Sequence, residues 1–222
     1  MESYKFHGMN IVFLGDFNTK IFQPAWFSRE GLLNKQEADA ANIHIVHQDI
    51  TSFSLDWLNF EVTPMRLVMA TAQEPYFEFI KDLAIGTFKL LRHTPIRAMG
   101  INKDVDFILE SEAKWHAFGD LLTPKNLWQE IINKPGMSNI SMEGIRTDGL
   151  KGYIQVRVGP SKKFKPGVYI NVNDHFEIQN SNLMGCEEII GILEKNWNNS
   201  VERSKQIISH LWRKSNDYTT ST

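Results

Sequence analysis

The chain has 222 residues, of which 42% are hydrophobic and 23% charged, and its formal net charge is −2. This composition excludes disordered and fibrous proteins, and the charge lacks the basic excess typical of nucleic-acid-binding domains. One cysteine, Cys186, excludes an intramolecular disulfide. We find no secretory leader and no apolar run long enough to span a membrane, so we expect a cytoplasmic protein.

The first fifty residues predict short strands separated by loops. The apolar run 9–14 predicts a buried strand, and a helical turn is expected after Pro24. The segment 43–49, IHIVHQD, predicts another strand.

Two histidines and an aspartate in that segment raise the question of a metal site. A period of two places His44 on the face opposite His47 and Asp49. At most two ligands then share a face, fewer than the three or four that zinc requires. We therefore expect half-exposed strand histidines and no metal.

The clearest pattern lies between residues 51 and 109. It predicts, in order, a strand (51–62), a turn at Thr63-Pro64, a strand (65–72), a helix (74–93) stopped by Pro95, and a strand (96–102). The helix has apolar residues at helical spacing: Phe77, Ile80, Ala84, Phe88 and Leu91. No catalytic motif stands at any joint, so this stretch predicts a fold and no chemistry.

Two short helices, 111–122 and 125–133, lead to a second β-rich half. Its predicted strands are 138–146, 152–158 and 167–178, with Thr147-Asp148-Gly149 as a hairpin turn. A long helix follows from about Glu187, with a one-sided stripe of residues at threes and fours: Ile190, Leu193, Trp197, Val201, Ser204, Ile208 and Leu211. Cys186 is in line with this stripe, which favours a buried, inert thiol over a reactive one.

These elements predict an α+β fold. We expect an antiparallel sheet in two β-rich halves with two long helices packed on its faces. Residues 1–222 form a single domain in this interpretation. Pseudo-halves 1–110 and 137–215 are joined by the short two-helix connection.

Two short motifs raise an enzymatic alternative. GDFN, Gly15 to Asn18, follows an apolar strand, and NDH ends at His175. Together they resemble the exonuclease–endonuclease–phosphatase family, which implies a metal-dependent phosphoesterase or nuclease using Asp16, Asn18, Asp174 and His175. In that family GDFN lies deep in the chain, after a metal-binding Glu and another Asn. Only fourteen residues precede it here, so the alternative interpretation is a strand end followed by a turn.

The second half also predicts a polar surface. Alternation along two strands puts six polar residues on one face, where they are expected to form a ligand- or partner-binding patch: Tyr153, Gln155, Arg157, Asn171, Asn173 and His175. The alternative is an ordinary solvated sheet face. Asp174 interrupts the apolar face of the same strand, and we expect a bulge or bend there.

Common enzyme signatures are absent from the sequence, among them P-loop, GxGxxG, GxSxG, HExxH and CxxC motifs. We therefore expect no catalytic residues, no cofactor and no metal, and we lean against an enzyme. Two basic groups could contact phosphate: Arg92, His93 and Arg97, and Lys162, Lys163 and Lys165. With an acidic overall balance, we do not expect nucleic acid as a partner.

The order of elements resembles a sporadically distributed bacterial family of uncharacterised proteins. The resemblance rests on MRLVMATA, FIKDLAIGTFKLL followed by TPIRAMGIN, and GVYINVNDHFEI followed by the long terminal helix. It covers roughly residues 53 to 211. It implies a similar fold and, from patchy occurrence, a mobile or defence-associated setting, and it carries no catalytic residue across.

The leading functional hypothesis is a binding or assembly protein, a subunit of a bacterial complex that associates with a protein partner or with itself. It rests on the missing catalytic set and on tryptophans suited to interfaces: Trp26, Trp57, Trp115, Trp128 and Trp212. The metal-dependent phosphoesterase and a small-molecule sensor on the polar sheet face remain alternatives.

Overall fold

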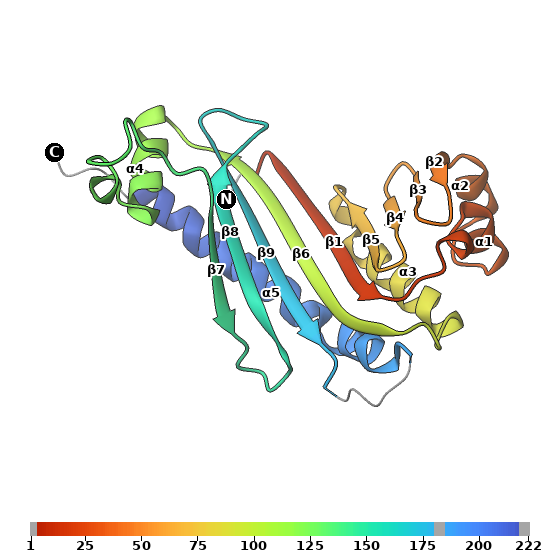
Figure 1. Ribbon diagram of the computed structural model, residues 1–222. Helices are drawn as coiled ribbons and strands as arrows, with labels where there is room; N and C mark the ends of the chain where they lie inside the picture. The colour runs from red at the N-terminus through yellow and green to blue at the C-terminus, as the bar shows by residue number, and fades with distance from the viewer. Residues whose placement is uncertain (1–3, 180–184, 218–222) are drawn as a thin grey trace.

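The computed structural model describes residues 4–179 and 185–217, and in this part of the chain all strands belong to one nine-stranded antiparallel sheet. The order is β2-β3-β4-β5-β1-β6-β9-β8-β7. The strands are β1 (Phe6–Gly15), β2 (Asn42–Val46), β3 (Thr51–Ser54), β4 (Asn59–Val62), β5 (Arg66–Thr71), β6 (Ile96–Ile108), β7 (Ile140–Ile145), β8 (Gly152–Pro160) and β9 (Gly167–Glu177). The two predicted β-rich halves are thus joined into one sheet, with β1 and β6 side by side near its middle (Figure 1).

The two long helices pack on the same face of this sheet. The helical segments are η1 (Thr19–Ile21), α1 (Pro24–Arg29), α2 (Lys35–Asp39), η2 (Glu74–Tyr76), α3 (Phe77–Leu90), α4 (Glu112–Leu122), η3 (Lys125–Leu127) and α5 (Glu187–Asp217). In Figure 1, α5 runs obliquely behind β6 and β9. It meets α3 where Trp197 Nε1 donates a hydrogen bond to Glu78 Oε1 at 2.6 Å. The predicted α+β class, antiparallel sheet with long helices, is confirmed.

The apolar stripe of α5 faces the sheet as predicted. Leu193, Trp197 and Ile208 are fully buried, and Ser204 fits against the sheet at 1% exposure. The N-terminal part of α5 closes a core that it shares with α1 and α3, whereas its C-terminal part closes a second core with α4. Helix α5 therefore contributes to both hydrophobic cores, one towards each end of the sheet.

Residues 51–62 form two strands and not the single strand predicted. The Leu55 N–H donates to the Leu58 carbonyl at 2.8 Å and closes a hairpin between β3 and β4. Its turn contains Trp57, which is buried and stacks on Tyr76 with ring centroids 5.0 Å apart. The turn lacks Gly and Pro, and Asp56 is its single common turn residue, so the pattern resembled one continuous strand.

Element ends also differ from the prediction. The main helix ends at Leu90 rather than near His93, and β6 continues to Ile108. Residues 125–133 do not form the predicted helix. The short turn η3, Lys125–Leu127, is the only helical element in this range. Ile131 in this segment is 74% exposed. A short helix needs an apolar face packed on a neighbour, and this segment has none.

Strand β2 departs from simple alternation. Its register with β3 shifts between Ile43 and Ile45, so a bulge interrupts the period of two at His44. His47 lies beyond the end of the strand, with its Nδ1 3.2 Å from Asp49. All five residues of β2 are exposed, so this edge of the sheet is short and irregular.

Candidate functional site

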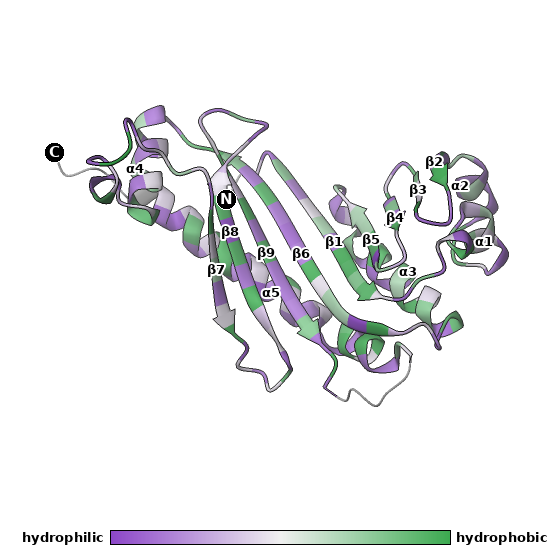
Figure 2. Cartoon of the chain, in the orientation of Figure 1, coloured by the Kyte–Doolittle hydropathy of each residue, from purple (hydrophilic) through white to green (hydrophobic). Residues whose placement is uncertain are grey.

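The six residues of the predicted polar surface lie on one face of the sheet. The register of β8 with β9 pairs them directly: Tyr153 with His175, Gln155 with Asn173, and Arg157 with Asn171. Figure 2 shows hydrophilic and hydrophobic residues alternating along these strands. This face lies opposite the one that packs against α5, whose buried residues on β9 are Val168, Ile170, Val172, Asp174 and Phe176.

The polar surface extends across two further strands. Asn173 pairs with Asn102 on β6, and Asn102 in turn pairs with Asn10 on β1. With Gln155, these residues form a row of four side-chain amides across four neighbouring strands. The prediction missed Asn10 and Asn102 because alternation along β8 and β9 does not indicate which strands lie next to β9. Alternation along β6 indicates only that Gly100, Asn102 and Asp104 share one face of their own strand.

Asp104 is the centre of hydrogen bonding on this face. Its carboxylate accepts bonds from Asn10 Nδ2 and Asn171 Nδ2, each at 3.0 Å, and a short bond from the Tyr169 hydroxyl. Burial, followed by the bond to Asp104, raises the pKa of Tyr169, which keeps its phenol protonated. The carboxylate is thus held by three donors from two neighbouring strands and has the properties of a structural anion.

His175 belongs to a different part of the same face. Its ring stacks on Tyr153, with centroids 4.4 Å apart and planes tilted by 21°. Burial lowers the pKa of His175, so the imidazole is neutral near pH 7. A neutral ring stacked on an aromatic partner is suited to packing and to hydrogen bonding, and less suited to binding an anion.

Gly100 makes room for the amide row. A Cβ at this position would lie 2.7 Å from Asn173 Oδ1. That oxygen is buried and has no hydrogen-bond partner in the described structure. The polar face therefore contains one unsatisfied acceptor next to a glycine.

The residues of the phosphoesterase hypothesis do not converge. Asp16 pairs with Arg97, at 3.0 Å, at the end of β1. The Asn18 side chain accepts from the Lys20 N–H and caps η1. Asp174 and His175 are successive strand residues and point to opposite faces of the sheet. Within residues 4–179 and 185–217, no group of three or more His, Cys, Asp or Glu is placed to hold a metal ion.

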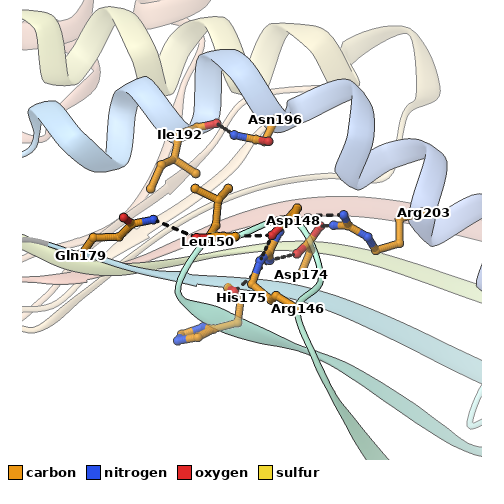
Figure 3. A network of polar contacts seen from close by, with 10 residues as sticks. Arg146, Asp148, Leu150, Asp174, His175, Gln179, Ile192, Asn196 and Arg203 are labelled. Atoms are coloured by element: carbon orange, nitrogen blue, oxygen red, sulfur yellow. Dashed lines mark hydrogen bonds and ion pairs between the residues drawn. The ribbon is translucent and has the colours of Figure 1, made fainter.

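Asp174 is not in a bulge, contrary to expectation, because the registers of β9 with β6 and β8 continue unbroken through it. Its carboxylate is fully buried and accepts short charge-assisted bonds from Arg146 and Arg203. Arg146 also bonds Asp148, with Nε to Oδ1 at 3.1 Å, and Arg203 Nη2 lies 3.2 Å from Asp148 Oδ2. We call these four residues the ion cluster (Figure 3).

The ion cluster links the β7–β8 turn, strand β9 and helix α5 through ion pairs. Arg146 directly precedes the predicted hairpin turn between β7 and β8, and Asp148 is the central residue of that turn, while Asp174 is on β9 and Arg203 is on α5. The Arg146 side chain is 1% exposed. Its hydrogen bond to Asp148 is the main reason that the pKa of this carboxyl is lowered to about 2. The two arginines and two aspartates of the ion cluster have no net charge together. The buried carboxylate of Asp174 is therefore compensated where it lies beneath α5.

The β7 end of the sheet is apolar and open. A groove of about 410 Å³ lies between α5 and the strands β7 and β8. Its lining is almost entirely apolar and consists of Leu122, Ile140, Met142, Val156, Val158, Gln206, Ile207, His210 and Leu211. Met142 at its rim is 65% exposed, and Ile145 at the end of β7 is 92% exposed. We call this groove and strand β7 the β7 surface.

The tryptophans proposed as interface residues differ in their exposure and in their contacts within the chain. Trp57 is buried and donates to Glu37 at 3.0 Å, and Trp115 donates to the Gly167 carbonyl at 2.9 Å. Trp212 packs edge-to-face on Phe107, with centroids 4.6 Å apart. Trp128 is the exposed one, at 46%, and it lines a second pocket beside β7.

Searches of protein-family models and of curated proteins return no match for this chain. Among the residues that the structure describes, no helix is both long and apolar enough to cross a membrane.

Proposed function

We propose that this chain is a binding or assembly protein that associates with protein through the β7 surface. The observation that carries the proposal is the open apolar groove beside an exposed edge strand. Soluble proteins rarely leave such apolar patches open unless a partner covers them. Burial of apolar area is the main favourable term in protein association.

Two further features favour this location. Met142 and Ile145 are exposed on a strand whose outer edge pairs with no other described strand, so a partner gains backbone hydrogen bonds in addition to apolar contact. Trp128 lies close by, and tryptophan is enriched where interfaces bind most strongly.

The test is affinity purification of the tagged chain from its native cell, comparing Met142→Glu with Met65→Glu. The control is matched, because Met65 is 68% exposed and lies in the turn between β4 and β5. We expect a protein retained in near-stoichiometric amount by the wild type and by Met65→Glu, and lost from Met142→Glu. Purification of the wild type alone, as a monomer, would refute the proposal.

A further inference from the structure

We infer that the partner of the β7 surface is a second copy of this chain, paired edge to edge through β7 about a two-fold axis. The inference rests on the proposed function and names its partner. It depends on the contrast between the two sheet edges and on three features of β7 that agree on one register.

The two edges of the sheet differ in how they are protected. Natural edge strands avoid pairing by bulges, prolines, lysines or short length. Strand β2 has a bulge between Ile43 and Ile45. Strand β7 pairs with β8 in unbroken register over six residues, and Glu143 is its single charged residue. The β7 edge is therefore open to another strand, and β2 is not.

Symmetry restricts how β7 can pair with itself. Antiparallel pairing of two identical strands requires a two-fold axis perpendicular to the sheet, so one residue faces its own copy. An axis at Glu143 would place two carboxylates directly opposite each other, which is unfavourable. An axis at Met142 instead places two exposed apolar side chains in contact, on the face that holds the groove.

The charges on the polar face agree with the axis at Met142. Glu143 then lies opposite Ser141 of the second copy, whose neighbour on β8 is Arg157. Among the described residues of its own chain, the side chain of neither Glu143 nor Arg157 makes a hydrogen bond or ion pair, and their only electrostatic partners there are His175 and Tyr169, respectively. Their backbones would be about 10 Å apart, two strand spacings, with only a serine between them. Glutamate and arginine side chains together span that gap, and symmetry provides two such pairs.

Ile145 also finds a partner in this register. It is 92% exposed in the single chain. The axis at Met142 places it opposite Asn139 of the second copy, at the rim of the pocket lined by Trp128 and Ile132. This register thus places the most exposed large apolar side chain of β7 beside a segment that lines a partly apolar pocket of the other copy.

The experiment is oxidative cross-linking of the purified full-length Met142→Cys chain. Directly opposed strand residues lie within disulfide range. Cys186 gives little background, because it is 2% exposed and burial raises its pKa to about 11. We expect a covalent dimer from Met142→Cys and none from Ile45→Cys, a control on the β2 edge that is 43% exposed.

A charge exchange tests the register independently. By sedimentation, we expect Glu143→Arg alone and Arg157→Glu alone each to raise the dimer dissociation constant roughly tenfold, because each removes two cross-strand pairs. The double exchange should restore it. A wild-type monomer, higher oligomers, or no rescue in the double variant would overturn the inference. If a different protein is lost from Met142→Glu in the native purification, the proposed function stands and the second copy is rejected.

Discussion

Replacing Asp174 with asparagine tests whether the ion cluster holds the β7–β8 hairpin against α5. The carboxylate is fully buried, and its two oxygens accept from Arg146 and Arg203. An asparagine has one oxygen, so one guanidinium must face an amide NH₂ and lose its acceptor. The cluster also changes from neutral to a net charge of +1 under the helix.

The expected loss of unfolding free energy depends on which ion pairs Arg146 and Arg203 keep after the substitution. Breaking a buried ion pair by removing one partner costs about 3–5 kcal/mol. Arg146 keeps its bonds to Asp148, and Arg203 is 29% exposed, so water can reach it. We therefore expect the lower end, a loss of about 3 kcal/mol in the free energy of unfolding.

Urea unfolding followed by tryptophan fluorescence measures this loss. The matched control is Glu177→Gln on the same strand, whose ion pair with Lys151 is long, at 3.7 Å, and exposed. Such surface pairs contribute little, so we expect a change below about 0.5 kcal/mol. Equal effects of the two substitutions would contradict the assignment of a stabilising role to the ion cluster.

Two further predictions concern titration. The pKa of Asp148 is lowered to about 2 from its ordinary 3.8, so its contribution to stability is present above pH 4 and is lost as the pH falls towards 2. Because this carboxyl is partly exposed, we expect it to account for about 1 kcal/mol of the loss measured by urea unfolding between pH 5 and 2, so that the loss is smaller by about that amount in Asp148→Asn. Cys186, whose pKa burial raises to about 11, should react with a thiol reagent only on unfolding, and fast labelling of the native chain at pH 8 would contradict its burial.

The long periodic elements could be predicted from the sequence, because their apolar residues repeat over several turns or strand positions. Helix α5 begins at Glu187 as expected, and most of its stripe is buried, whereas Val201 and Leu211 are half-buried. The ends of helices and strands that depend on tertiary contacts could not be predicted from such repeats. The β3–β4 hairpin turns through Trp57 and Leu58, which are buried, so its residues have a strand-like pattern.

The polar surface was predicted in part, for a physical reason. Alternation along β8 and β9 indicates which residues share a face, and the structure pairs them as supposed. Alternation does not indicate which strand lies next to β9, so the contributions of Asn10, Asn102 and Asp104 required the sheet order. The ion cluster was missed because Asp174 suggested a local backbone irregularity, whereas its partners are far away in the sequence.

The ion cluster and the proposed dimer are linked through one hairpin. The edge strand β7 ends at Ile145, next to Arg146, so the bonds of Arg146 to Asp174 fix the end of the strand that must pair. A hairpin released from α5 would keep its pairing with β8 but lose its fixed orientation towards a second copy. The Asp174→Asn chain, held under conditions in which it remains folded, should therefore cross-link more slowly through Met142→Cys than its parent. An unchanged rate would mean that pairing with β8 alone orients the edge, and that the ion cluster acts on stability only.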